Sequence, residues 1–431
     1  MSMTQEEADC VVLDNGSHKI KAGYAGNDCP IHTFRTVIGT PLHKVWINET
    51  NLKQPGMSSS DEEDPCVVLD NGSHRIKAGY AGDDSPRSIF RTIVGTPLFE
   101  GQTIDGKSQQ KFYVGDQLKI EDMDTLEIRR PIERGIVTDW EAMGAVWNFV
   151  FGDLRVNPSD HNVLVTEPQM NPKSNREKMA QVMFEKIQPR GMYVISPNVL
   201  SLYASGRGSG LVVDSGFEVT SVMCIYEGRK VAQSIFRSDI GGNDITNYLI
   251  ELLGKRGFTF TTAKEIEEVS IIKERCAYVC TNPEAQKEDD IYTFSNGTIV
   301  CLGNERFQCM EAMFDPSLIG SKACGIHELI VKSIKACPMH VRGDICCNVI
   351  VSGSNTMTPG IATRIDQELR KVLPVNRKIK VIAPPERRSS TWIGGSIVSS
   401  LSLAQNMWIT PMHYDEYGPN VVYRPEFTRY G

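Results

Sequence analysis

From residue 131 onward, short apolar runs alternate with segments whose apolar positions recur every three to four residues. Runs of strand type occur at 136–137, 163–165, 194–195, 222–231 and 349–351. Helical periodicity extends over 140–151, 174–187, 199–205, 244–256 and 265–278. Strands that alternate with helices are typical of a layered α/β fold.

Two of the apolar runs end in the same kind of small polar turn. Val67-Val68-Leu69 leads into Asp70-Asn71-Gly72-Ser73, and Leu211-Val212-Val213 leads into Asp214-Ser215-Gly216. Glycine lets the backbone approach a ligand closely, turn amides and hydroxyls donate to phosphate oxygens, and Lys77 adds positive charge. A carboxylate at a strand end that faces phosphates typically holds Mg²⁺ through water. One such turn is first of all an ordinary hairpin, but two of them predict a cleft that clamps one phosphate chain.

The first of these turns occurs twice in the chain. Residues 10–42 match residues 66–98 at 25 of 33 positions, including the Asp-Asn-Gly-Ser-His turn. A repeat seen once is not a solenoid, so the pattern indicates a duplicated first segment. Between the copies, residues 43–64 contain Pro55-Gly56 and an acidic run, as is typical of a linker.

One fold has room for one first strand. The second copy should occupy it, because this copy closes the shorter loop and keeps its register. The spare copy then has unpaired apolar strands that are mobile or able to exchange into a neighbouring subunit. The alternative is that the extra segment is an artefact of the reading frame.

Composition and charge narrow the class of protein. The chain has 431 residues, 40% hydrophobic and 23% charged, which is enough for two domains with their own cores. A net charge of −7 argues against a nucleic-acid backbone as the main partner. No run of about 18 apolar residues occurs, so no membrane insertion is expected.

The 12 cysteines are scattered, without a secretory signal and without a Cys-x-x-Cys pair at matching histidine spacing. This pattern predicts reduced thiols buried as small hydrophobic residues in a cytosolic protein, and it argues against a zinc site. The cysteines placed in apolar strands and helices are Cys224, Cys276, Cys280, Cys301, Cys346 and Cys347.

Several longer motifs, taken in order, resemble the actin family. They are Gly72 to Asp84, Tyr113-Val114-Gly115-Asp116, Leu200 to Arg207, Gly303-Asn304-Glu305-Arg306-Phe307, Ala383-Pro384-Pro385-Glu386-Arg387 and Trp392-Ile393-Gly394-Gly395-Ser396. Actins also begin with Met, a short acidic run and the first strand, as residues 57–67 do. The resemblance implies the actin-like ATPase fold, an α/β fold in which two pseudo-symmetric domains, each of two subdomains, surround a nucleotide cleft.

The resemblance also implies the domain boundaries. Residues 1–56 are a duplicated partial first segment with its linker, expected to be poorly ordered, and residues 57–431 form a complete actin-like unit. Subdomain 1 is expected at 57–91, 131–204 and 390–431, subdomain 2 at 92–130, subdomain 3 at 205–240 and 322–389, and subdomain 4 at 241–321.

The ligands that the resemblance implies are ATP or ADP with Mg²⁺, with Ca²⁺ as an alternative ion. Asp70 and Asp214 would hold the ion through water. The residues implied in nucleotide binding are Asp70, Gly72, Ser73, His74, Lys77, Asp214, Ser215, Gly216, Asn243, Asp244, Lys273, Glu274, Gly353, Ser354, Asn355, Met357 and Arg388. Helical spacing places Lys273 and Glu274 on an exposed turn, and the family pattern places both beside the adenosine.

The hydrolytic machinery departs from the family. The attacking water must be aligned with the γ-phosphate, and actins place a glutamine for this where the chain has Pro197, which has no side-chain donor or acceptor. Two histidines of the family's water network align with Arg134 and Ser221. No catalytic residue is therefore secure, and Asn198 with Ser196 is the candidate replacement. We expect ATP hydrolysis to be slow or absent.

Two turns of the predicted cleft also differ in sequence from the actin family. Phe217 and Glu218 stand where actins have Asp-Gly, and they should strain the second turn or repel phosphate. Ser354 replaces the second of two glycines and fits only if its φ stays negative or if mild strain is tolerated. His74 and Phe217 are expected to weaken nucleotide affinity.

By resemblance, the chain is a cytoplasmic, cytoskeletal protein that binds MgATP and assembles with itself into filaments. It would offer a hydrophobic cleft near Tyr203 and Leu401 to actin-binding proteins, and the acidic run from Asp61 to Asp64 is a candidate contact for myosin. The alternative is a non-polymerising actin-related scaffold that uses ATP structurally, which the polar loop at 102–110 and Pro197 favour. A phosphotransferase of the same superfamily is the third option.

Overall fold

The computed structural model describes most of the chain from residue 64 onward. The described residues are 64–98, 111–118, 126–282, 289–295, 297–375, 377–401, 404 and 406–428, with the backbone of 11–15, 19–24 and 32–35 nearer the N-terminus. The polar loop expected at 102–110 and the acidic residues 61–63 lie outside the described residues.

The first half of the molecule is built on a five-stranded sheet with the order β13-β12-β4-β5-β6. Its strands are β4 (Val67–Asn71), β5 (Arg75–Tyr80), β6 (Ser88–Arg91), β12 (Asn162–Thr166) and β13 (Gly191–Ile195). β4, β12 and β13 run parallel, while β5 and β6 continue antiparallel from the turn after β4. Val67 and Leu69 belong to one hydrophobic core and Val68 to another. β4 is therefore apolar on both faces, as expected for a strand covered from both sides.

The second half repeats this topology in the order β16-β15-β14-β20-β21, with β17 also paired to β15. Its strands are β14 (Gly210–Ser215), β15 (Thr220–Tyr226), β16 (Arg229–Lys230), β17 (Phe236–Ser238), β20 (Val349–Ser352) and β21 (Val381–Ile382). Like β4, β14 pairs in parallel with a later strand on one side and antiparallel with its hairpin partner on the other. The prediction of an α/β fold with two similar halves is confirmed.

Two helices, α3 (Pro197–Ala204) and α10 (Ser390–Ser399), form the layer that the halves share. One hydrophobic core contains Val68 of the first sheet, Val212 of the second, and Leu200 and Trp392 of these helices. A Cβ on Gly394 would lie 1.9 Å from the carbonyl oxygen of Leu200, so only glycine permits this close contact. The two halves are thus joined by a continuous core at their base.

Further helices cover the outer faces of the two sheets. They are α1 (Trp140–Leu154), α2 (Lys173–Val182) and the π-helical turn η5 (Met183–Ile187) on the first sheet, and α7 (Ile326–Ala336), α8 (Arg342–Cys346) and α9 (Ile361–Val372) on the second. Among the described helices, none is long and apolar enough to cross a membrane.

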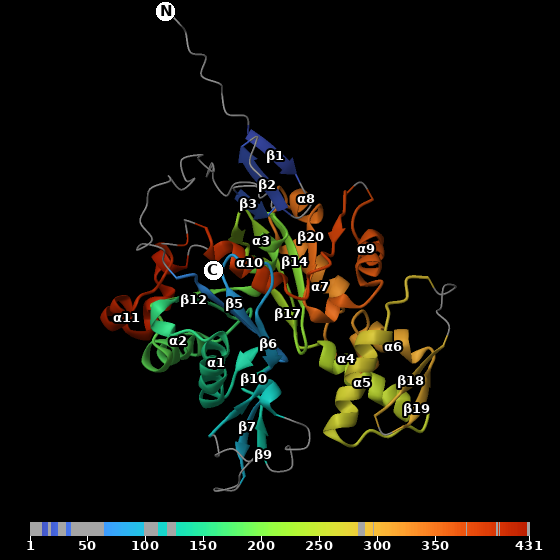
Figure 1. Ribbon diagram of the computed structural model, residues 1–431. Coiled ribbons are helices and arrows are strands. Elements are labelled where there is room, and N and C mark those ends of the chain that lie inside the picture. Colours follow the sequence, from blue (N-terminus) through green and yellow to red (C-terminus); the bar gives the residue numbers. More distant parts are fainter. Residues whose placement is uncertain are drawn as a thin grey trace, which may run out of the picture.

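A smaller part extends from each half (Figure 1). The first is the three-stranded sheet β8-β7-β9, formed by β7 (Val94–Pro97), β8 (Tyr113–Val114) and β9 (Leu126–Arg129). The second comprises α4 (Gly242–Gly254), α5 (Ala263–Cys276), α6 (Glu305–Glu311) and the hairpin of β18 (Asp290–Thr293) with β19 (Ile299–Leu302). Short elements complete the fold: β10 (Ile132–Glu133), β11 (Ile136–Val137), α11 (Pro411–Tyr417), η2 (Gly115–Gln117), η4 (Pro158–Asp160), η6 (Ala232–Ser234), η8 (Pro316–Ile319), η9 (Ser354–Met357), η11 (Gly418–Tyr423) and η12 (Pro425–Phe427).

Helix starts follow their capping residues. α1 begins at Trp140 because Asp139 Oδ1 accepts hydrogen bonds from the backbone N–H groups of Glu141 and Ala142. The helix expected to start at residue 199 instead starts at Pro197, since the fixed φ and missing N–H of proline suit the first helical position.

The first copy of the duplicated segment forms a sheet of its own from β1 (Val11–Asn15), β2 (Lys19–Tyr24) and β3 (His32–Arg35) (Figure 1). Its register equals that of the second copy, since Val11 pairs with Tyr24 as Val67 pairs with Tyr80. Among the described strands, β1 to β3 pair only with one another, whereas β4 also pairs with β12.

The cysteines in the described part of the chain are all free thiols. Cys224 and Cys346 are buried as expected. The expectation of burial is wrong for Cys301, which is exposed because it lies on the solvent side of the two-stranded β18–β19 hairpin. The other three of the six cysteines named above, Cys276, Cys280 and Cys347, are only half-buried, as is Cys324.

Candidate functional site

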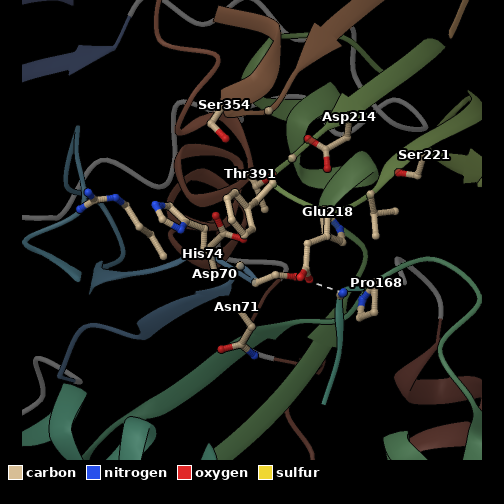
Figure 2. Close-up of a pocket in the computed structure, with 18 of the residues that line it drawn as sticks. Asp70, Asn71, His74, Pro168, Asp214, Glu218, Ser221, Ser354 and Thr391 are labelled. Carbon is tan, nitrogen blue, oxygen red and sulfur yellow. Dashed lines mark hydrogen bonds between the residues drawn. The ribbon is translucent and has the colours of Figure 1, made fainter. Parts of the chain in front are cut away.

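The turns that follow β4 and β14 border one cavity of about 440 Å³ between the two halves. Cavities that bind small molecules typically have volumes of about 300–1,000 Å³. The predicted site residues that line it are Asp70, Gly72, Ser73, His74, Lys77, Asp214, Gly216, Glu274, Gly353, Ser354 and Arg388, together with Pro197, Asn198 and Ser221. Figure 2 shows Asp70, Asp214, His74 and Glu218 around this cavity, with Ser221 on the strand beside Asp214.

Asp70 lies at the end of β4 and is buried. Its cross-strand neighbour Lys77 donates from Nζ to Oδ2 at 2.8 Å, and Thr166 donates from Oγ1 to Oδ1 at 3.4 Å. The backbone N–H of Asn71 donates to Thr166 Oγ1 at 2.8 Å, which fixes the turn to the end of β12. The carboxylate is thus held in place by a cation and a hydroxyl at the edge of the cavity.

Asp214 occupies the equivalent position at the end of β14. Burial, and secondarily the charge of Asp70, raise the pKa of Asp214 to about 6. Two carboxylates that face the same cavity repel each other when ionised, and a divalent cation relieves that repulsion. This pair is the part of the cavity best suited to Mg²⁺.

Glycines make the turns narrow enough for this arrangement. A Cβ on Gly72 would lie 2.5 Å from the carbonyl oxygen of Arg75, and a Cβ on Gly353 would lie 2.2 Å from that of Ser215. Gly353 also has a φ of +93°, which side chains disfavour. The next residue, Ser354, has no positive φ and begins η9, so its predicted condition for fitting is met.

The rings of His74 and Phe217 stack across the cavity, with centroids 4.4 Å apart and planes inclined by 26°. Burial, and then the charge of Arg75, lower the pKa of His74 to about 4, so the ring is neutral at pH 7. Neither Phe217 nor Glu218 has a positive φ. The backbone at this turn is therefore not left-handed, and Phe217 packs on the His74 ring. The predicted repulsion of phosphate by the turn stays a prediction.

Arg134 lies behind the turns and does not line the cavity. Its guanidinium contacts both carboxylate oxygens of Asp244, at 3.1 and 3.2 Å, and the carbonyl oxygen of Glu218 at 3.1 Å. Its backbone N–H donates to Glu218 Oε2 at 2.7 Å. Arg134 belongs to the β10–β11 hairpin of the first half, while Asp244 belongs to α4, so these bonds tie the two sides of the cleft together.

The cavity is also bordered by Glu274 and Arg388, whose Oε2 and Nη2 atoms lie 2.6 Å apart. Lys273 differs from its prediction: the side chain is buried and donates from Nζ to the carbonyl oxygen of Gly242 at 2.5 Å. Burial lowers the pKa of Lys273 to about 8. This turn of α5 is exposed at Glu274 and buried at Lys273, because α5 packs against α4 on the Lys273 side.

The other predicted binding residues that do not line the cavity are Ser215, Asn243, Asp244, Asn355 and Met357. Ser215, Asn243 and Asn355 make contacts at the base of the turns. Ser215 Oγ contacts Thr220 Oγ1 at 2.8 Å and accepts from Asn355 Nδ2 at 3.1 Å, and the backbone N–H of Asn243 donates to the carbonyl oxygen of Phe217 at 2.6 Å.

Sequence reasoning missed Gln169, Arg237 and Thr391, which also line the cavity. Gln169 donates from Nε2 to Ser196 Oγ and, at 3.2 Å, to Asn198 Oδ1. A signal for Gln169 was present: it lies three residues beyond β12, and residues that follow neighbouring parallel strands meet at one sheet edge.

The residues present fit a magnesium-bound phosphate chain. Two carboxylates face the cavity, Lys77 is near one of them, and glycine turns bring backbone from both halves close to the enclosed space. Glu218 adds a further carboxylate to the lining, and the His74–Phe217 stack lies at the same turns. The lining therefore suits Mg²⁺ and phosphate chemically, but it does not enclose them tightly.

A family model described as actin matches this chain in two stretches, residues 5–62 and residues 61–426. The second match covers well over half of the chain and includes both turns and the cavity. The first match covers the other copy of the duplicated segment.

Proposed function

The chain belongs to the actin family, and we propose that it is a cytoskeletal protein that binds MgATP between its two halves and assembles into filaments, with ATP hydrolysis slow or lost. The observation that carries the proposal is the pair of carboxylates, Asp70 and Asp214, at the ends of equivalent strands on one cavity. Lys77 and the backbone of the glycine turns would hold the phosphates, while Glu274, Gly353 and Arg388 would border the nucleoside. Bound Mg²⁺ would neutralise phosphate charge there.

The family also supports self-association and binding of partner proteins. We propose that partners dock at the hydrophobic cleft near Tyr203 and Leu401, and that myosin contacts the acidic run from Asp61 to Asp64. Leu401 is half exposed, as an apolar contact residue should be. The proposed location is the cytoplasmic cytoskeleton.

A second candidate is a non-polymerising scaffold in which nucleotide has a structural role only. Two contacts across the cleft favour it: the His74–Phe217 stack and the bonds of Arg134 to Asp244 and Glu218. Both join the halves without any ligand. Filament assembly and its dependence on nucleotide distinguish the two candidates.

The test is high-speed sedimentation of the purified chain in salt with Mg²⁺, with ATP compared with ADP, alongside titration with a fluorescent ATP analogue. We expect nucleotide-dependent pelleting and saturable binding. Lys77→Ala should weaken binding by about 10-fold or more, since it removes a charge-assisted contact to phosphate. Lys21→Ala is the matched control, because Lys21 is the same residue in the other copy.

The possible outcomes separate cleanly. A protein that binds the analogue but stays in the supernatant supports the scaffold and contradicts the filament. A protein that binds no nucleotide contradicts both. Equal losses for Lys77→Ala and Lys21→Ala would mean that the second copy does not form the site alone.

A further inference from the structure

Gln169 anchors a polar cluster in the cavity that connects three separate segments. Its Nε2 donates to Ser196 Oγ and to Asn198 Oδ1, and Ser221 donates from Oγ to the same Asn198 oxygen at 3.1 Å. Gln169 follows β12, Ser196 and Asn198 follow β13, and Ser221 lies on β15 of the second half. The cluster therefore lies where the two halves meet.

Pro197 lies within this cluster, at the place where its family has the glutamine that aligns the attacking water. Pro197 lies between Ser196 and Asn198 and lines the cavity with a hydrocarbon ring. Attack on a phosphoryl group requires a water held in line with the bond that breaks, and a proline side chain cannot orient a water. The side-chain amide of Gln169 contacts both neighbours of Pro197, Ser196 and Asn198.

Gln169 is held at its backbone and at its side-chain nitrogen. Arg237 Nη1 donates to the backbone carbonyl of Gln169 at 3.4 Å, and Ser196 and Asn198 engage the side-chain nitrogen. Within the described part of the chain, no group donates to Gln169 Oε1. Only 8% of the residue is exposed, yet it lines the cavity. The acceptor oxygen is thus positioned in advance, which is what orientation of a reactant requires.

We propose that Gln169 is the residue that positions the attacking water for the residual ATP hydrolysis of this chain. The inference rests on the proposed function, since it requires ATP to bind in the cavity. Gln169 Oε1 accepts a hydrogen bond from the water, and the Asn198–Ser221 pair fixes the amide across the cleft. Gln169 orients the water without acting as a base, because a neutral amide takes up no proton near pH 7.

The step balances as a hydrolysis. The water oxygen forms a bond to the γ-phosphorus, and the bond from that phosphorus to the bridging oxygen breaks, leaving its electron pair on ADP. The proton lost by the water passes to the released phosphate or to solvent. No oxidant, reductant or further reactant takes part.

The experiment measures phosphate release from pre-bound ATP in a single turnover, using the full chain with Mg²⁺, and measures affinity for a fluorescent ATP analogue in parallel. Gln169→Ala should lower the rate by about 10- to 100-fold, the usual effect of losing alignment of a reactant. Nucleotide affinity and the melting temperature should not change. A merely structural role would lower affinity and melting temperature together with the rate.

Two further variants sharpen the result. Gln181→Ala is the matched control: Gln181 lies on α2, where it contacts Lys178 and Glu185 at the surface, and its rate should equal that of the unaltered chain. The double variant Gln169→Ala with Pro197→Gln should release phosphate faster than Gln169→Ala alone. It places a new side-chain amide beside the space that the Gln169 amide occupied.

The inference is overturned if Gln169→Ala retains the full rate, or if its rate and affinity fall in parallel. It is also overturned if the unaltered chain binds MgATP and releases no phosphate, although the proposed nucleotide-binding function would then stand. Failure to bind MgATP at all would remove the proposed function and, with it, this inference.

Discussion

The two copies of the first segment form the same local structure but have different surroundings. In both, the strand that ends in Asp-Asn pairs antiparallel with the next strand, and the register is identical: Asp14 pairs with Lys21 and Asp70 with Lys77. Only the second copy continues into a larger sheet, where β4 lies beside β12 in parallel. Among the described strands, β1 has β2 as its only partner.

This difference separates what the local sequence determines from what the fold adds. A turn with fixed register needs only the residues of the hairpin, so both copies form it. A phosphate site also needs the facing turn after β14 and the polar residues after β12 and β13, which only one hairpin can reach. The copy joined directly to the rest of the domain has the shorter loop to close.

The strongest test of this comparison uses one core leucine that occurs in both copies. Leu69 is fully buried in the core of the first half. Leu69→Ala should lower the free energy of unfolding by about 2–5 kcal/mol, because it removes buried surface and leaves a cavity. Leu13→Ala should change it by less than about 1 kcal/mol, since β1 adds no strand to the main sheets. Urea unfolding followed by tryptophan fluorescence measures both.

Equal losses in the two variants would contradict the difference described here. They would mean that the first copy takes part in the main core of the protein in solution. A large loss for Leu13→Ala alone would mean that the copies have changed places.

Periodicity predicted much of the fold because the information is local. The helices that became α1, α4 and α5 follow from apolar spacing and from capping residues such as Asp139. The two carboxylate turns could also be predicted, since the pattern of apolar strand, Asp and Gly occurs in both halves of the chain. β4 and β14 hold equivalent places in the two sheets, and their ends bring Asp70 and Asp214 to one cavity.

The rest of the site depends on distant contacts that no local pattern records. The stack of His74 on Phe217 joins residues from different halves, and the bonds of Arg134 to Asp244 join β10–β11 to α4. The position of the Gln169 side chain depends on its contacts with Ser196 and Asn198, which follow the neighbouring strand. Lys273 was expected on an exposed turn, because helical spacing cannot show which side of α5 is covered by α4.

The pH dependence of stability gives the next test. The pKa of His74 is about 4 in the folded chain and about 6.5 when the chain is unfolded. Between these values the unfolded state binds more protons, so the free energy of unfolding rises with pH and is lost as pH falls. The effect of this one residue is at most about 3 kcal/mol at low pH. His74→Phe keeps a ring for stacking on Phe217 and should remove this part of the slope.

The control is His18→Phe, the same substitution in the first copy, which should leave the profile unchanged. Asp214, with its pKa raised to about 6 chiefly by burial, acts in the opposite sense, since it loses stability as pH rises toward 6. That contribution is common to all three proteins, so the difference between His74→Phe and the unaltered chain isolates His74. Parallel profiles between pH 4 and about 6.5 for all three would contradict the assignment.

The smallest expected effect comes from removing the first copy and its linker, residues 2–56. In the described structure, β1 to β3 contribute no strand to either main sheet, so the melting temperature should change by no more than about 2 °C, the equivalent of about 1 kcal/mol in a large domain. Nucleotide affinity should be the same, because every residue of the cavity lies beyond residue 69.

Association between chains should change, however. The spare hairpin has the sequence needed to replace β4 and β5 in another copy of the chain, so the unaltered protein should form more dimer at high concentration than the shortened one. Light scattering over a concentration series measures this difference. A shortened chain that melts much earlier would show that the first copy is part of the fold, and equal association of the two proteins would exclude strand exchange.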